Sequence, residues 1–292
     1  MKILHKYLLL GICTTVLLGA CGGDKPTKTE KAEIPVEKAA VEISVLDAVI
    51  AGEWRADQAK RDEFRHPKQT LEFFGLAPGQ NVLEISPGGG WYTNILAPYI
   101  KQAGGSYNAA IFEAAMGERY MAANERFTKK FADTERFGHI NMVEFGPTSG
   151  ALADGNIDLI VSFRNTHSWM GGGYAEKAFA DFYGALKPGG VLGIVSHRLP
   201  ESAEQNPKAP TGYVQVSYVK DLAQQAGFEF VAASEVNANP KDTADHPYGV
   251  WTLPPSSRSP KEGEDVPEGF DAAKYQAIGE SDRFTLKFRK PK

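Results

Sequence analysis

Each of two histidines, His167 and His197, comes just after an apolar run in the sequence. An imidazole with a pKa near neutrality suits a general base or acid, so both side chains could exchange a proton with a ligand. Arg164 and Arg198 lie close to them, and a guanidinium group could hold a carboxylate or a phosphate. The alternative for each histidine is a structural hydrogen bond inside the fold.

A glycine-rich turn follows another apolar run. The sequence Asn-Val-Leu-Glu-Ile-Ser-Pro-Gly-Gly-Gly-Trp at 81–91 combines a short strand pattern with three successive glycines, and apolar residues at helical spacing come after it. A strand, a glycine turn and a helix form the first half of a nucleotide-binding unit, because glycines let a ligand approach the backbone and the helix N-terminus offers unpaired N–H groups. The alternative is a tight turn without a ligand.

The remaining composition narrows the chemistry. The two cysteines, Cys13 and Cys21, both lie in the N-terminal segment. No pair of histidines has the close spacing of a zinc motif, so we expect no metal site, although a metal-assisted enzyme using His167 and His197 stays an alternative. The chain carries a formal net charge of −4 and no cluster of Lys and Arg, which argues against nucleic acid as a partner.

Strand and helix patterns alternate along the chain and position these residues. We expect strands at 82–85, 106–112, 141–145, 156–163, 191–195, 228–233 and 283–289, and helices at 91–99, 116–131, 174–186 and 214–226. This order predicts an α/β fold of the doubly wound, Rossmann-like type, with a mainly parallel sheet, an antiparallel last strand and helices on both faces. Ligands bind such sheets beyond the carboxyl ends of the strands.

Three further groups of residues have two interpretations each. A charged run that includes Arg61, Asp62 and Arg65 is either a solvated helix face or a group turned inward over the glycine turn. The polar stretch that contains Asn237 and Asn239 is either a wall of a substrate site or a loop whose side chains bond their own backbone. Aromatic residues near the expected strand ends either cover a substrate or pack in the core; they are Trp91, Tyr92 and Trp169.

The N-terminus has the pattern of an export signal. Two lysines precede an apolar core, and Leu-Gly-Ala-Cys at 18–21 resembles the lipobox of bacterial lipoproteins. We therefore expect a lipoprotein signal peptide at 1–20, lipidation of Cys21, a flexible tether at 21–42, and a single domain at 43–292 that begins with helices at 43–75. The predicted location is the periplasm of a Gram-negative bacterium, with the lipid as the membrane contact, in the inner or outer membrane.

The assembled pattern resembles the class I S-adenosylmethionine-dependent methyltransferases. The resemblance covers about residues 45–290 and depends on Val-Leu-Glu-Ile-Ser-Pro-Gly-Gly-Gly at 82–90, Ile-Asp-Leu-Ile-Val-Ser-Phe at 157–163 and Leu-Lys-Pro-Gly-Gly-Val-Leu at 186–192. Phe-Arg-Asn-Thr-His-Ser-Trp at 163–169 and Gly-Val-Trp-Thr-Leu-Pro-Pro at 249–255 are similar to a group of predicted exported bacterial methyltransferases. The family implies a seven-stranded sheet and S-adenosylmethionine as the cofactor.

The resemblance also implies roles for individual residues. Glu84 matches the acid that ends the first strand, and Ser86 stands where the family has its first loop glycine. The acid that holds the ribose at the end of the second strand has no match, so Glu113 is its expected substitute. The implied cofactor site is Glu84, Ser86, Gly88, Gly89, Gly90 and Glu113, and Asn165 stands where many family members position an acceptor. From their chemistry and their positions after strands or in the polar stretch, the candidate catalytic residues are His167, His197 and Asn165, and the candidate substrate contacts are Arg164, Trp169, Arg198, Asn237 and Asn239.

The resulting hypothesis is methyl transfer from S-adenosylmethionine to a small molecule by an exported, lipid-anchored protein. A binding protein for a nucleoside-like or other small ligand on the same fold is the alternative from a different class. The sequence leaves the acceptor and the oligomeric state open.

Overall fold

The computed structural model describes residues 44–292, so the predicted signal peptide, Cys21 and the tether lie outside the described residues. Residues 43–292 belong to one compact unit. Among the helices that the structure describes, none is long and apolar enough to cross a membrane.

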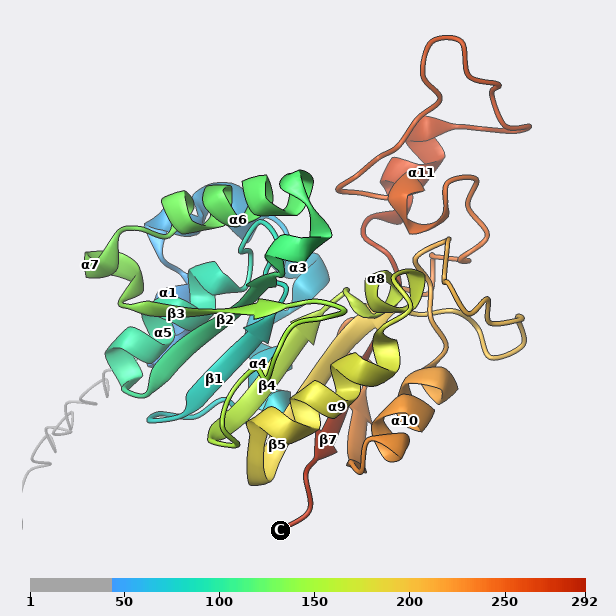
Figure 1. Cartoon of the computed structure of the whole chain (residues 1–292). Helices are drawn as coiled ribbons and strands as arrows, with labels where there is room; N and C mark the ends of the chain where they lie inside the picture. Colours follow the sequence, from blue (N-terminus) through green and yellow to red (C-terminus); the bar gives the residue numbers. More distant parts are fainter. Residues whose placement is uncertain (1–43) are drawn as a thin grey trace, which may run out of the picture. The chain divides into compact units, whose positions relative to one another are not determined.

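A single seven-stranded sheet forms the centre of this unit (Figure 1). Its strands are β1 (Asn81–Ile85), β2 (Ser106–Phe112), β3 (Ile140–Phe145), β4 (Ile157–Phe163), β5 (Leu186–His197), β6 (Glu229–Ser234) and β7 (Arg283–Arg289). They lie in the order β3-β2-β1-β4-β5-β7-β6. Strands β1 to β5 pair in parallel, and β7 is antiparallel to both β5 and β6. The predicted doubly wound sheet with an antiparallel last strand is confirmed.

Helices cover both faces of the sheet. One face carries α1 (Val45–Ile50), α4 (Pro67–Phe74), α5 (Thr93–Ala103), α6 (Glu118–Lys130) and α7 (Thr134–Phe137); the other carries α8 (Thr166–Gly171), α9 (Ala175–Ala185) and α10 (Val216–Gln225). The remaining elements are η1 (Glu53–Arg55), α2 (Ala56–Ala59), α3 (Asp62–Arg65), η2 (Ala114–Met116), η3 (Gly249–Thr252) and α11 (Ala272–Ile278).

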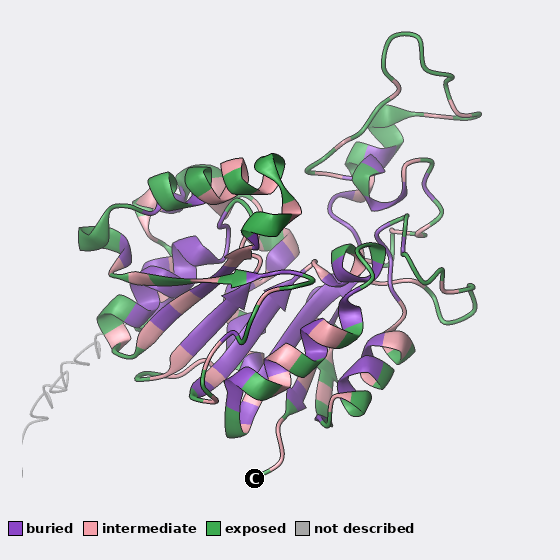
Figure 2. Ribbon diagram, viewed as in Figure 1, coloured by how far each residue is buried: buried purple, intermediate pink, exposed green. Residues whose placement is uncertain are grey.

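The alternation of side chains along β1 divides the core into two layers. Leu83 and Ile85 pack with α9 and α10, whereas Val82 packs with α5 on the opposite face. All three are fully buried, and each contributes about 1.5–3 kcal/mol through burial. Figure 2 shows the central strands as the most continuously buried part of the chain. Because helices cover both faces of the sheet, a ligand can reach it only at the ends of the strands.

Two segments from opposite ends of the unit reach over the carboxyl ends of the central strands. One contains α2 and α3, and the other is the long connection between β6 and β7, which contains η3 and α11. They meet where Arg61 Nε donates to the Glu280 carboxylate at 2.6 Å, across 219 residues of sequence. The predicted site at the strand ends is therefore covered by segments that lie outside the alternating pattern.

Candidate functional site

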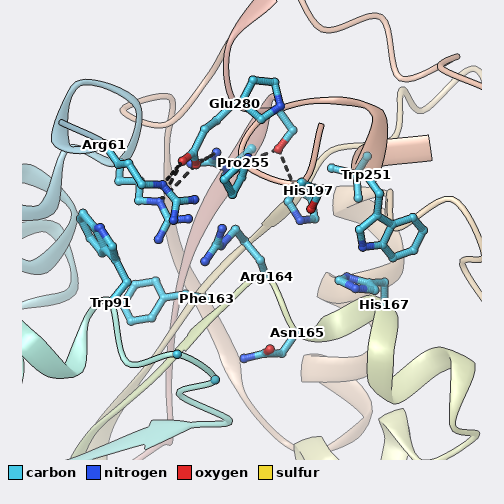
Figure 3. Close-up of a pocket in the computed structure, with 18 of the residues that line it drawn as sticks. Arg61, Trp91, Phe163, Arg164, Asn165, His167, His197, Trp251, Pro255 and Glu280 are labelled. Atoms are coloured by element: carbon cyan, nitrogen blue, oxygen red, sulfur yellow. Dashed lines mark hydrogen bonds and ion pairs between the residues drawn. The ribbon is translucent and has the colours of Figure 1, made fainter. Parts of the chain in front are cut away.

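A cavity of about 470 Å³ opens at the carboxyl ends of β1, β4 and β5 (Figure 3). The strand order reverses between β1 and β4, which is where ligands bind in sheets of this type. The cavity brings together residues that the sequence predicted to share a site: Ser86, Gly88, Gly89, Arg164, Asn165, His167 and His197. Trp91 also lines the cavity, which agrees with the interpretation that an aromatic residue near a strand end covers a substrate.

The glycine bend after β1 presents bare backbone on its cavity side. A Cβ built on Gly88 or Gly89 would meet no atom within 4 Å, and Gly88 has a positive φ of 57°. Gly90 differs, because its Cβ would lie 2.3 Å from the ring of Phe131, and it does not line the cavity. Close packing therefore requires the third glycine, whereas the first two leave room for a ligand.

Two non-glycine residues take the left-handed conformation at neighbouring strand ends. Ser86 has φ 48° after β1, and Arg164 has φ 65° after β4. Such residues cost about 1–3 kcal/mol each and persist only where the surroundings hold them. Asn165 holds the bend at Ser86, because its Nδ2 donates to the carbonyl of Ile85 at 2.9 Å and to that of Ser86 at 3.2 Å. Asn165 thus fixes the shape of the bend, and its amide nitrogen is engaged there.

A cluster of arginines surrounds Glu280 on one side of the cavity. Arg61 Nε lies 2.6 Å and Arg65 Nε 3.1 Å from the carboxylate, and Arg283 also donates to it. Burial opposes the ionisation of Glu280, but the three arginines outweigh it and hold its pKa at about 2. Of the two interpretations of this charged run, the inward one holds for Arg61 and Arg65, which line the cavity, whereas Asp62 pairs with Arg55 outside it.

The arginines outnumber the acids in this cavity. Its lining contains Arg61, Arg65, Arg164 and Arg283 but one carboxylate, that of Glu280. Burial lowers the pKa of Arg65 to about 10, so it stays a cation at neutral pH. In Figure 3, Arg164 lies between this cluster and the two histidines. The predicted guanidinium in the site is therefore part of a larger positive region.

The two histidines form the opposite wall. Their ring centroids are 5.7 Å apart, and His167 is also 5.7 Å from the ring of Trp251. His197 Nδ1 lies 2.6 Å from Ser281 Oγ, whereas His167 Nδ1 has no hydrogen-bond partner among the described residues. Burial, followed by the charge of Arg164, lowers the pKa of His167 to about 4. Both rings are therefore neutral at pH 7, since burial lowers the pKa of His197 as well.

Two acids predicted to hold the cofactor lie outside this cavity. Glu84 is buried behind the bend, where Thr93 Oγ1 donates to it at 2.9 Å and Tyr107 at 2.5 Å. The Glu113 carboxylate accepts from the hydroxyl of Thr148 and from its backbone N–H at 3.0 Å. Glu113 is thus fixed to the loop after β3, and the expected contact with a ligand is not available to it in this arrangement.

Four predicted substrate contacts also need correction. Trp169 packs in the core with its ring 5.2 Å from that of Phe182, because the turn of α8 directs it away from the cavity. Arg198 donates to Glu235 at 2.5 Å and does not line the cavity. Asn237 donates to Thr70 and Thr285, and Asn239 donates to the backbone of Ile278 and Glu280. Asn237 thus connects its loop to α4 and β7, Asn239 connects it to the end of α11 and the segment after it, and neither lines the cavity.

The sequence interpretation missed several residues of the cavity. Phe163, Trp251, Pro254, Pro255, Ser281 and Arg283 all line it. Phe163 ends an expected strand, and the others belong to the connection before β7 or start that strand. Arg283 also forms an ion pair with Glu280. The pairing of Glu280 with Arg61 and Arg65 leaves no local pattern in the sequence, because those partners come from the other end of the chain.

Among the residues from 44 onward, no group of three or more His, Asp or Glu side chains is arranged to hold a metal ion. The histidine pair has no carboxylate close enough to complete such a group. The metal-assisted alternative therefore has no preformed set of ligands in this part of the chain.

Comparison with known proteins shows which fold this architecture has. No family model matches the chain. A candidate sarcosine dimethylglycine methyltransferase of Galdieria sulphuraria superposes with a TM-score of 0.53 at 15% identity, covering 81% of this chain and 86% of that one. This chain has the class I methyltransferase fold.

Two more solved structures and one sequence are similar. The [4+2]-cyclase SpnF has a TM-score of 0.49 at 16% identity, covering 78% of this chain and 80% of that one. The N-methyltransferase NodS of Bradyrhizobium japonicum has a TM-score of 0.47 at 17% identity, covering 85% of this chain and 97% of that one. The hybrid PKS-NRPS synthetase mpsA of Macrophomina phaseolina is 32% identical over 184 residues, which are 60% of this chain. The match spans 4% of that synthetase.

The two sides of the bend differ in how well they would fit the cofactor of this fold. On the β4 side, the open backbone at Gly88 and Gly89 fits a polar end group. On the β2 side, the gap is about 10 Å³ and is bordered by Phe112, Asn124 and Phe127. Asn124 closes it by bonding both backbone groups of Phe112. The residues fit the amino-acid end of S-adenosylmethionine, and α6 would have to move to admit its nucleoside end.

The buried Glu84 gives a testable dependence on pH. Burial raises its pKa from 4.5 to about 7, although Tyr107 and Thr93 donate to the carboxylate. The folded protein then holds this proton more tightly than the unfolded chain. The stability that Glu84 contributes is therefore fully present below pH 4.5 and is lost as the pH rises through 7.

The glutamine of Glu84→Gln stays neutral at every pH. We therefore expect the free energy of unfolding of the variant, minus that of the wild type, to rise by about 3 kcal/mol between pH 4.5 and pH 8. Urea denaturation of both proteins across this range measures the difference. A difference that stays constant with pH would show that Glu84 titrates normally.

Proposed function

We propose that this protein transfers a methyl group from S-adenosylmethionine to a small-molecule acceptor. The supporting observation is the glycine bend, whose bare backbone at Gly88 and Gly89 faces a cavity of about 470 Å³ at the reversal of strand order. The methyltransferase fold is consistent with this proposal, although fold alone does not determine activity.

Several groups of the cavity have a part in the proposed reaction. The cofactor supplies an electrophilic methyl group when it is bound. Ser86, Gly88 and Gly89 would hold its amino-acid end, while the ring of Trp91 borders the same space. Methyl transfer to oxygen or nitrogen depends mainly on alignment and on removal of the acceptor's proton. His167 Nδ1 has no partner among the described residues, but with a pKa of about 4 the imidazole is a weak base, so it would receive that proton only from an acidic acceptor.

A second candidate is a protein that binds a small ligand without methyl transfer. The closed gap of about 10 Å³ beside β2 favours it, as does the engagement of Glu113 with Thr148. In this candidate the β4 side of the bend and the arginine cluster hold the ligand, and α6 stays in place. The two candidates differ in whether S-adenosylmethionine binds at all.

A glycine substitution tests the proposed cofactor contact. We expect the wild-type protein to bind S-adenosylhomocysteine, and Gly89→Ala to weaken binding by about tenfold or more, equivalent to ~1.4 kcal/mol. The added methyl group meets no protein atom within 4 Å, so the melting temperature should stay unchanged. Isothermal titration calorimetry and thermal denaturation measure these two quantities.

Gly184→Ala is the matched control, because Gly184 has equally open space and lies in α9, outside the cavity. It should bind as the wild type does. Absence of heat with millimolar S-adenosylmethionine and S-adenosylhomocysteine would overturn methyl transfer and leave the second candidate. Equal affinity in Gly89→Ala and the wild type would remove the bend from the binding site.

We further propose that the protein is exported and lipid-anchored through Cys21. The support is the sequence pattern Leu-Gly-Ala-Cys at 18–21 after an apolar core. Expressed in a Gram-negative host, the wild type should be found in the membrane fraction, and Cys21→Ser should be released from it. Cell fractionation with detection by antibody measures the distribution. A Cys21→Ser protein that stays in the membrane fraction would contradict lipidation at this residue.

A further inference from the structure

Arg65 offers two buried N–H groups that nothing in the described protein accepts. Its side chain is 2% exposed, and its Nε is bound by Glu280. Nη1 and Nη2 have no hydrogen-bond partner among the described residues, although Arg65 lines the cavity. Its guanidinium carbon lies 4.7 Å from the ring centroid of Trp91, so the ring supports one face of the group. Buried donors of this kind are normally satisfied, so a ligand acceptor is expected beside them.

Further donors point to the same place. Arg61 Nη2 is also buried and without a partner in the described part of the chain. Arg164 extends from the end of β4 into the middle of the group drawn in Figure 3, opposite Arg61. Its backbone is held in the left-handed conformation, with its N–H donating to Val195 O at 2.7 Å. Guanidinium groups from two separate segments therefore border one space.

The charge of the cavity indicates how many negative charges a ligand would bring. Four arginines and one glutamate line it. Burial, followed by the charges of Arg65 and Arg283, lowers the pKa of Arg164, but a guanidinium group keeps its proton in proteins; with both histidines neutral at pH 7, an excess of three positive charges remains. The whole chain has a net charge of −4, so the positive charge is a local feature of this cavity. A neutral or singly charged ligand would leave most of the excess uncompensated.

We propose that the cavity binds a small molecule through a doubly charged oxyanion of the phosphate monoester class, held by Arg65, Arg61 and Arg164. A guanidinium fork matches carboxylate and phosphate oxygens alike, and the excess charge favours phosphate, which carries nearly two negative charges at pH 7. This inference rests on the proposed function in one respect: the bound phosphate monoester is the methyl acceptor only if the protein is a methyltransferase.

The test is isothermal titration calorimetry of the purified protein with inorganic phosphate and with acetate, at low and equal ionic strength. We expect phosphate to bind at least tenfold more tightly than acetate. Arg65→Met keeps the packing against Trp91 but removes the fork, and should weaken phosphate binding by about tenfold or more. Arg61→Gln changes a side chain that is 24% exposed, so it should fold, and it should weaken binding in the same direction.

Arg55→Met is the matched control. Arg55 is fully buried and lies 5.2 Å from the same Trp91 ring, but it pairs with Asp62 and does not line the cavity. Its phosphate affinity should equal that of the wild type. Absence of phosphate binding in the wild type would overturn the inference, as would equal losses in Arg55→Met and Arg65→Met. If Arg65→Met does not fold, the comparison of Arg61→Gln with the wild type decides.

A parallel titration with S-adenosylhomocysteine separates this inference from the proposed function. Phosphate binding without S-adenosylhomocysteine binding would overturn methyl transfer and uphold the anion site. S-adenosylhomocysteine binding without phosphate binding would overturn the anion site and leave the proposed methyl transfer in place. If S-adenosylhomocysteine displaces phosphate and Arg65→Met weakens both equally, the arginines hold the carboxylate of the cofactor, and the inference about the acceptor is wrong.

Discussion

The ion pairs of Glu280 hold the candidate site together. One carboxylate joins Arg61 and Arg65, near the start of the described chain, to Arg283 at the start of the last strand. Without it, three neighbouring guanidinium groups would repel one another with no carboxylate between them. Breaking a buried ion pair typically costs about 3–5 kcal/mol, although forming one contributes little to stability. The pairs therefore fix the position of the segment that covers the strand ends more than they stabilise the fold.

Several unfavourable features meet at this one place. Ser86 and Arg164 have left-handed backbones, Arg65 has unsatisfied donors, and desolvation and the charge of Arg164 lower the pKa of His167. Local departures of this kind are expected at functional sites and are supported by the rest of the fold. The sheet around them is regular, with β1 and β4 almost wholly buried. On the β2 side of the same bend, Phe112 and Phe127 leave little space, so the site is open mainly toward β4.

The fold could be predicted from the sequence almost completely, because strand and helix periodicities are local. The predicted strand at 283–289 has the same bounds in the structure, and the buried run of β4 differs by one residue. The site was predictable only at the ends of strands, as for Arg164, which follows β4, and His197, which ends β5. Trp169 shows the limit, since one turn of α8 directs it into the core. Arg65 and Glu280 could not be paired, because no local rule connects residues 215 positions apart.

The position of β7 has a consequence for synthesis of the chain. This strand lies between β5 and β6, yet it is made after every other strand, and Glu280 and Arg283 arrive with it. A nascent chain on the ribosome can pair β1 to β5 early, but β6 has no neighbour until residues 283–289 emerge. The arginines of α3 lack their carboxylate until the same moment. The sheet is therefore completed only after residues 283–289 have been made.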